Sequence, residues 1–170
     1  MAGSEPRDFS ENNMVKFLVR AAQVAAAVVG PFAATSAAGP ETPTAATELE
    51  RMQGTWDYEI QTVGGWELPA DRRAKLWGVI KGDIMTKEIG LGPGLKYRIK
   101  LDTTTSPKSI DLTSIEHPSG MTYTNVGIYE WDGKLLRLCF DNTGKDRPKE
   151  FRSPAGQDNI YVSVLRRRDK

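Results

Sequence analysis

The chain has one cysteine and one histidine, and this limits the chemistry that its side chains can perform. A disulfide framework needs paired cysteines, and a zinc or iron–sulfur site needs several cysteine or histidine ligands. His117 precedes Pro118 in an expected turn, so we interpret it as an exposed loop residue rather than a general base or metal ligand. Cys139 lies within an apolar segment, which favours a half-buried structural thiol over a nucleophile. The sequence therefore predicts no metal and no cofactor.

Carboxylates are the remaining candidates for acid–base chemistry, and four stand out: Asp111, Glu116, Glu130 and Asp132. A glycosidase needs two such groups roughly 5–10 Å apart across a sugar-binding cleft. These four alternate with apolar residues, a pattern typical of the solvent-facing side of strands. The glycine-rich stretch 90–94 lacks the helix and the Lys-Ser/Thr pair that follow a phosphate-binding loop. We expect a protein that is not an enzyme, with a carboxylate-based glycan hydrolase as the least favoured alternative.

The charge balance argues against nucleic acid as a partner. The chain has 23 Lys and Arg residues and 22 Asp and Glu residues, so its formal net charge is +1. A nucleic-acid-binding domain normally carries a basic excess that displaces counterions from phosphates. A basic cluster at 166–168 is typical of a strand that ends in solvent. Among the four tryptophans, Trp66 follows two glycines in a loop-like segment and is the best candidate for an exposed contact.

The N-terminal segment has the three parts of a secretory signal peptide. Lys16 and Arg20 precede an uncharged, alanine- and valine-rich run from Ala21 to Pro40, which ends in small residues of the kind that a signal peptidase accepts. We expect residues 1–38 to be cleaved after Ala38, which would export the protein to the periplasm, the cell surface or the medium and leave no transmembrane segment. The alternatives are cleavage after Ser36 or Ala37, a translation start at Met14, and an uncleaved membrane anchor. The anchor is disfavoured because the run is rich in alanine and carries polar residues.

The rest of the chain is organised as a spacer and one domain. Residues 39–47 are rich in Pro, Thr and Ala and are expected to form a flexible spacer. The segment 48–168 is long enough for one domain with its own core. Its hydrophobic pattern has a period of two, which is typical of strands with one buried face. In the first such run, the pattern places Trp56, Tyr58 and Ile60 on the same face.

Turns rich in glycine, proline and aspartate separate eight expected strands. Their ranges are 54–62, 76–81, 84–89, 96–102, 109–116, 122–131, 134–141 and 159–167. Short helical turns are expected at 47–52 and 69–75. Regular short strands with hairpin links favour an all-β fold, an antiparallel up-and-down β-barrel of about eight strands with one or two short helical turns.

The start of the first strand, Gln53-Gly54-Thr55-Trp56, resembles the Gly-x-Trp signature of the lipocalins and the wider calycin superfamily. The resemblance implies a lipocalin-like barrel in which Trp56 closes one end and a basic residue of the last strand packs on its ring. Arg166 and Arg167 are the candidates. Arg166 is preferred because it continues the alternation that would place Ile160, Val162 and Val164 inside the barrel.

Four further segments carry a second resemblance, to a family of secreted bacterial domains. Segments 106–112, 127–133, 136–139 and 147–151 occur in an order similar to that of an uncharacterised secreted domain found in planctomycete bacteria. This resemblance covers nearly all of 48–168. It implies the fold and the export already described, and it brings no established activity.

Alternation also predicts which side chains face the interior of the barrel. The candidates for ligand contact are Tyr58, Tyr97, Ile99, Leu112, Leu138 and Phe140. A barrel of this size holds either packed side chains or one small ligand. A cavity below about 100 Å³ would argue against a carrier of small molecules.

These observations favour an exported, non-enzymatic, lipocalin-like domain that binds a small apolar or amphipathic molecule. The first alternative is a structural or protein-interaction module whose partner is another cell-envelope protein. That alternative predicts an exposed apolar patch, for which Trp66 and Trp77 are the candidates. The second alternative is the glycan hydrolase considered above.

Overall fold

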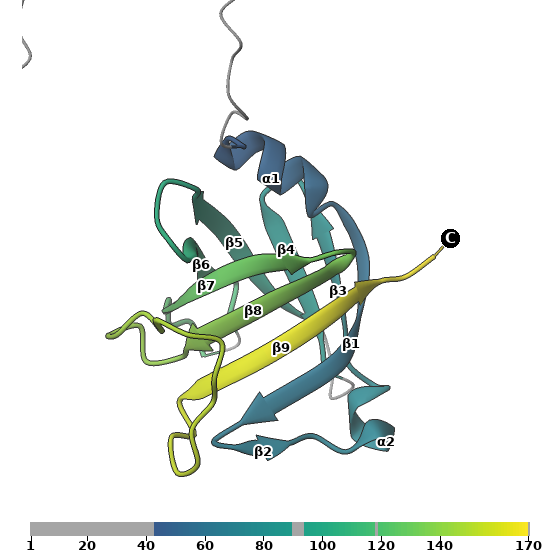
Figure 1. Cartoon of the computed structure of the whole chain (residues 1–170), viewed down its shortest axis with the longest axis vertical. Helices are drawn as coiled ribbons and strands as arrows, with labels where there is room; N and C mark the ends of the chain where they lie inside the picture. Colours follow the sequence, from purple (N-terminus) through teal and green to yellow (C-terminus); the bar gives the residue numbers. More distant parts are fainter. Residues whose placement is uncertain (1–42, 90–93, 118, 170) are drawn as a thin grey trace, which may run out of the picture. The chain divides into compact units, whose positions relative to one another are not determined.

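The computed structural model describes residues 43–89, 94–117 and 119–169 (Figure 1), all of which belong to one compact unit. The expected signal peptide, residues 1–38, lies outside the described residues, as do residues 39–42 of the expected spacer and most of the glycine-rich stretch 90–94. No helix in the described ranges combines the length and the apolar character that a membrane crossing requires.

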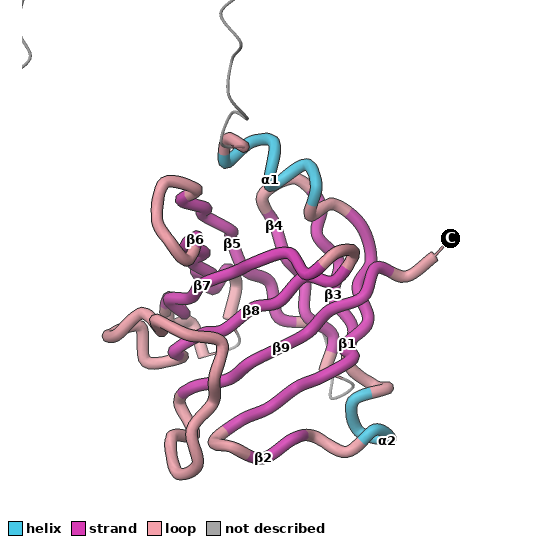
Figure 2. The backbone as a smooth tube through the Cα atoms, in the orientation of Figure 1, coloured by secondary structure: helices cyan, strands magenta, loops and turns pink. Residues whose placement is uncertain are grey.

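Nine strands form one antiparallel sheet that closes on itself (Figure 2). They are β1 (Gly54–Val63), β2 (Trp66–Glu67), β3 (Trp77–Lys81), β4 (Ile84–Glu88), β5 (Leu95–Asp102), β6 (Lys108–Ile115), β7 (Thr124–Asp132), β8 (Leu135–Asp141) and β9 (Ile160–Arg167). From β3 to β9 each strand pairs with the next, while β1 pairs with both β3 and β9 and so closes the barrel. β2 only extends the far end of β1. The expected all-β, up-and-down antiparallel barrel of eight strands is therefore confirmed.

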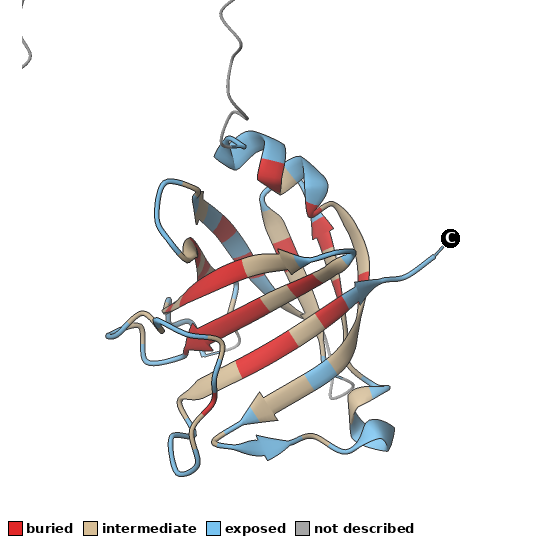
Figure 3. Ribbon diagram, in the orientation of Figure 1, coloured by how far each residue is buried: buried red, intermediate tan, exposed pale blue. Residues whose placement is uncertain are grey.

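Alternating burial explains why these segments form strands. Along β5, Tyr97 and Ile99 are buried in the core, whereas Lys96, Arg98 and Lys100 are exposed. An antiparallel strand with one wet and one dry face satisfies its backbone in the ladder and buries only its apolar side chains. Longer unbroken buried stretches occur on β7 and β8 (Figure 3), where both faces are covered.

The faces of β9 are the reverse of those expected from the sequence. Tyr161 and Leu165 pack in the barrel core, whereas Val162 lies on the outer face. That face is apolar because Phe151, in the connection between β8 and β9, packs over it. The same cover buries Cys139, whose thiol donates to a backbone carbonyl of the connection. Alternation alone cannot assign the faces of a strand that is apolar on both sides.

The reversal exchanges the roles of two neighbouring arginines. The prediction that Arg166 packs on Trp56 is wrong, because Arg166 is exposed and forms an ion pair with Glu59 on the outer face. The Arg167 guanidinium instead lies 4.6 Å from the centre of the Trp56 ring. A Cβ on Gly54 would approach Arg167 Nη1 to 3.2 Å at a φ of +124°, so glycine suits this position on both counts.

A β-bulge changes the faces of β1 midway along the strand. The register with β9 shifts between Tyr58 and Ile60, so that Tyr58 points inward and Ile60 outward. Ile60 is 38% exposed, and the expectation that it shares the face of Trp56 is wrong. Gln61 then points into the barrel, where it accepts a hydrogen bond from the Ser163 hydroxyl.

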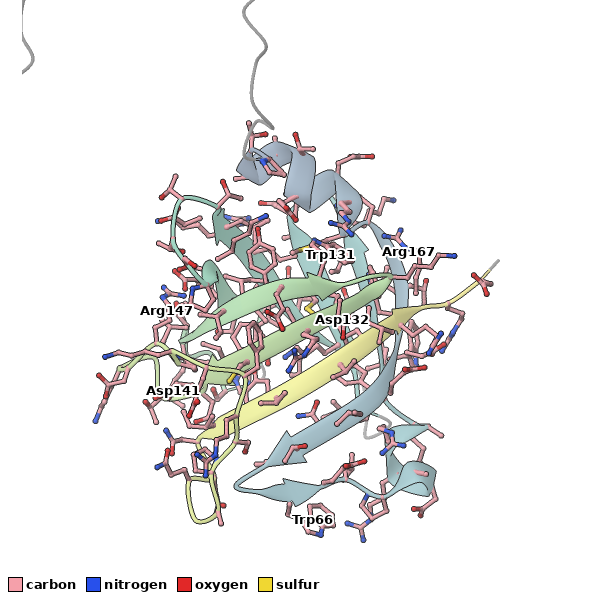
Figure 4. The ribbon with its side chains drawn as sticks, viewed as in Figure 1. Trp66, Trp131, Asp132, Asp141, Arg147 and Arg167 are labelled. Carbon is pink, nitrogen blue, oxygen red and sulfur yellow. The ribbon has the colours of Figure 1, made fainter. Side chains whose placement is uncertain are left out.

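Helix α1 (Ala45–Arg51) covers one end of the barrel (Figure 1). The helix takes in residues 45–47 of the expected spacer, and α2 (Ala70–Arg73) falls within the expected turn at 69–75. Glu48 of α1 is 2% exposed. Its carboxylate accepts hydrogen bonds from Lys108 Nζ at 2.5 Å and from Trp131 Nε1 at 2.7 Å. Figure 4 shows Trp131 and Arg167 side by side below α1, and together with Trp56 they seal this end.

Candidate functional site

A cavity of about 500 Å³ occupies the end of the barrel opposite α1. Its walls come from the ends of strands that point away from α1 and from the starts of strands that return towards it. The lining residues are Tyr58, Gln61, Val63, Leu76, Lys87, Glu88, Ile89, Leu95, Tyr97, Tyr123, Asn125, Asn142, Asp158 and Tyr161. The volume is well above the size that would argue against small-molecule binding, and it lies within the roughly 300–1,000 Å³ of typical ligand pockets.

Lys87 is the one side chain of the lining that carries an amine. The alternation of β4 turns Met85 and Lys87 to the interior, and Met85 is 1% exposed in the core. The Lys87 ammonium lies 5.2 Å from the ring centre of Tyr97, 5.4 Å from that of Phe140 and 5.0 Å from that of Tyr161. Aromatic faces attract a cation, and the effect grows as water is removed.

Burial of this ammonium has a direct electrostatic consequence. No carboxylate of the described ranges lies within 4.0 Å of Lys87 Nζ, which donates one hydrogen bond to the Tyr161 hydroxyl at 3.3 Å. Removal from water disfavours the charged form, and it lowers the pKa of Lys87 to about 8. Lys87 is half-buried and lines the cavity.

Tyrosine hydroxyls and three side-chain amides, those of Gln61, Asn125 and Asn142, add to the polar part of the lining. Tyr97 and Tyr123 share a hydrogen bond at 3.0 Å. Asn125, 4% exposed, donates from Nδ2 to the Tyr161 hydroxyl at 3.2 Å, and its Oδ1 has no partner among the described residues. Burial raises the pKa of Tyr58 and of Tyr97, so both hydroxyls stay protonated and remain hydrogen-bond donors at neutral pH.

The rest of the lining divides into an apolar part and two carboxylates. Val63 and Ile89 are 37% and 40% exposed, as expected for side chains at a mouth that opens to solvent. Leu95 is half-buried and packs on the core beneath. The carboxylates of Glu88 and Asp158 line the cavity without being the acidic residues that the sequence singled out.

Only part of the predicted interior set lines the cavity. Tyr58 and Tyr97 are lining residues, and Phe140 stacks on Tyr161 at 5.4 Å between ring centres. The other three candidates lie in the packed core: Ile99, Leu112 and Leu138. Sequence reasoning missed Lys87 and Asn125, although the period of two that places Met85 inside also places Lys87 there.

The side chains considered for catalysis do not converge on the cavity. Asp111, Glu116 and Glu130 form ion pairs with three different partners: Arg147, Lys96 and Arg137, respectively. Burial raises the pKa of the Cys139 thiol to about 11, as the structural interpretation of this residue implies. Within the described ranges, no group of three or more Cys, His, Asp and Glu side chains is placed to hold a metal ion.

His117 follows β6 and Trp66 begins β2, both at the end of the barrel opposite α1. His117 was expected to be exposed, but its ring packs edge-on against Tyr123 at 5.2 Å, which leaves it half-buried. Trp66 is 54% exposed at the end of the barrel opposite α1 (Figure 4). Trp77 is half-buried beneath the Arg168 guanidinium, 5.6 Å from its ring centre.

Comparison with known proteins found no match for this chain among protein-family models, curated proteins or solved structures. The interpretation of the cavity therefore begins from its own side chains. They combine an apolar mouth, a set of hydroxyl donors and one buried amine. Such a set can hold a molecule that has both an apolar body and a polar group.

Proposed function

We propose that this chain is an exported, non-enzymatic binding protein that holds one small amphipathic molecule inside its barrel. The observation that supports this function is the cavity of about 500 Å³ at one end of an otherwise packed barrel. A barrel that served only as a scaffold would gain stability by filling this space, because unfilled volume forfeits dispersion contacts. The contrast with the sealed α1 end favours a space that is kept for a ligand.

We also propose a relationship to the lipocalins. It rests on the barrel order, on Gly54 and Trp56 at the start of β1, and on the stacking of Arg167 over the Trp56 ring at 4.6 Å. The expected leader, with Lys16 and Arg20 before an uncharged run, supports the proposal that the protein acts outside the cytoplasm. Native mass spectrometry of the protein purified from its own host tests the export and the ligand binding together. We expect a mature N-terminus near residue 39 and a retained molecule that is lost under denaturing conditions.

A matched pair of variants tests whether the cavity is the binding site. Val63→Trp narrows the cavity mouth, whereas Ile60→Trp places the same ring on the outer face of β1, at a residue of nearly equal exposure. The neutral dye Nile red should brighten on the wild-type protein and on Ile60→Trp, and much less on Val63→Trp. Equal dye binding by the two variants, or none by the wild type, would contradict the proposal.

Trp66 favours a second candidate function, a docking module for another cell-envelope protein. Trp66 is 54% exposed, and an exposed tryptophan offers an apolar ring and an N–H group to a partner. Trp66→Ala should leave dye binding in the cavity unchanged, so the two functions can be separated by this variant. Loss of a co-purifying envelope protein in Trp66→Ala would support docking.

A further inference from the structure

The chemistry of the ligand can be narrowed from the hydrogen-bonding capacity of the cavity, on the premise that the proposed binding function holds. Lys87 Nζ carries three donors, and the described residues engage one of them, through the Tyr161 hydroxyl. The Tyr161 oxygen accepts from both Lys87 and Asn125, so its own hydrogen has to point to another acceptor. Tyr97 and Tyr123 share one hydrogen bond, which leaves one of their two hydrogens free.

Donors therefore outnumber acceptors on this wall of the cavity. The unpaired acceptor there is Asn125 Oδ1, and this atom has almost no accessible surface of its own. A ligand that brings acceptor oxygens would satisfy the free hydrogens of Lys87 and the tyrosines. A ligand that brings only donors would leave them unpaired, and buried unpaired donors are costly.

The positive charge of Lys87, at the inner part of the cavity that we call its floor, also favours a ligand with acceptor oxygens. The ammonium of Lys87 lies among the rings of Tyr97, Phe140 and Tyr161, and Phe140 is fully buried. Aromatic faces and one hydroxyl offset only part of the cost of removing this cation from water. An anionic group bound beside the ammonium would offset the rest of this desolvation cost. Because Lys87 carries a single positive charge, a group with a single negative charge is sufficient.

The carboxylates of the lining help to fix the orientation of the ligand. Glu88 and Asp158 repel an anion from their own parts of the wall, while Lys87 attracts it to the floor. Val63, Leu76 and Leu95 provide the apolar surface on which the remainder of the molecule can lie.

We infer that the cavity binds a small lipophilic carboxylate, whose head group pairs with Lys87 and the Tyr161 hydroxyl while its apolar body lies towards Val63, Leu76 and Leu95. A carboxylate is favoured over a phosphate because a second negative charge would have no cation to meet. Hydrogen bonds between a carboxylate and an ammonium are among the stronger ones available to proteins.

Isothermal titration calorimetry with two probes of equal chain length, decanoate and decanol, tests the inference on the full chain. At pH 7 the wild type should bind decanoate about tenfold or more tightly than decanol. Lys87→Met should abolish this preference by weakening decanoate about tenfold and decanol, which has a neutral acceptor, much less. Lys100→Met removes an exposed lysine of β5 and should match the wild type with both probes.

The outcomes separate this inference from the function on which it rests. Binding of both probes with equal affinity, or an unchanged preference in Lys87→Met, would overturn the carboxylate assignment and leave the binding function standing. Failure of both probes to bind the wild type would remove the binding function itself. Should Lys87→Met not fold, Tyr161→Phe keeps the ring and removes one donor, and it should weaken decanoate at least about threefold and decanol less. No change for decanoate in that variant would count against the assignment.

Discussion

Replacing Lys87 with methionine should make the empty protein more stable at neutral pH. The substitution keeps the unbranched stem of the side chain and removes the ammonium that lies among the rings of Tyr97, Phe140 and Tyr161. Most substitutions inside a protein destabilise it. This one is expected to do the opposite, because the fold bears an ammonium with no carboxylate partner in the described ranges.

The size of the effect follows from the pKa of Lys87, which falls from 10.5 in the unfolded chain to about 8 in the barrel. Each unit of difference corresponds to about 1.4 kcal/mol, so the charged form destabilises the fold by up to about 3 kcal/mol below pH 8. The cation–π contacts disappear together with the charge, and the net gain for Lys87→Met at pH 7 should be about 1–2 kcal/mol.

The dependence on pH has a definite sign. Between pH 8 and pH 10.5 the unfolded chain holds more protons on Lys87 than the folded chain does, so the free energy of unfolding rises with pH. For the wild type the rise between pH 7 and pH 9.5 should be about 2 kcal/mol from this residue. Above pH 10 the raised pKa of Tyr58 and of Tyr97 reverses the trend, because the unfolded chain then loses tyrosine protons first.

Urea unfolding at pH 7, 8.5 and 9.5, followed by tryptophan fluorescence, measures this difference. Wild type and Lys100→Met should gain stability across the range, and Lys87→Met should start higher and show no such gain. The curves of Lys87→Met and wild type should therefore converge towards pH 9.5. Parallel curves with a constant offset would refute the argument, because they would show that the pKa of Lys87 is the same in both states.

Two further substitutions test the packing at the sealed end and in the core. Arg167→Ala should lower the free energy of unfolding by about 1–2 kcal/mol, because a stacked guanidinium and two backbone contacts are lost. The exposed Arg166→Ala should change it by less than about 0.5 kcal/mol in the same urea experiment, and equal losses would restore the original assignment of Arg166. Gly127→Ala should destabilise by about 1–3 kcal/mol, since its Cβ would lie 2.3 Å from a Phe140 ring carbon. Gly78→Ala, whose Cβ would lie 3.4 Å from Met85 Cε and 3.6 Å from the Thr86 carbonyl oxygen, should lose far less.

The architecture could be predicted from the sequence because its two determinants are local. Alternation of apolar and polar side chains indicates which face of a strand is buried, as with Tyr97 and Ile99 among the lysines of β5. Turns such as Asp132-Gly133 state where the chain reverses. Neither signal depends on contacts between residues that are distant in the chain, so the order of an up-and-down barrel follows from them.

The assignments that failed depend on contacts that alternation does not encode. Val162 lies on the outer face of β9 and is nevertheless buried, because Phe151 packs over it. Nothing in the sequence pattern of β9 itself indicates this cover. Ile60 changes face because of a register shift, and a bulge moves every later residue of its strand by one position. Lys87 was missed for a different reason: a lysine in a strand is normally assigned to the solvent-exposed face, so it was not considered for the interior.

Lys87 and Lys108 both approach aromatic rings of the barrel interior, and their polar partners differ. Lys108 at the sealed end meets the carboxylate of Glu48 at 2.5 Å, whereas Lys87 has an amide, Asn125, two hydrogen bonds away through the Tyr161 hydroxyl. The protein thus pairs one interior ammonium with a carboxylate, while the described residues provide no such partner for the ammonium of Lys87 at the cavity.

Asn125→Asp would supply the missing charge from within the protein. The new carboxylate should raise the pKa of Lys87 towards its ordinary value, because a nearby negative charge favours the ammonium. The rise in stability between pH 7 and pH 9.5 should then flatten, and decanoate should lose its advantage over decanol because the same ammonium is already paired. A variant that keeps the slope of the wild type and still prefers decanoate would show that the Asn125 position does not communicate with Lys87.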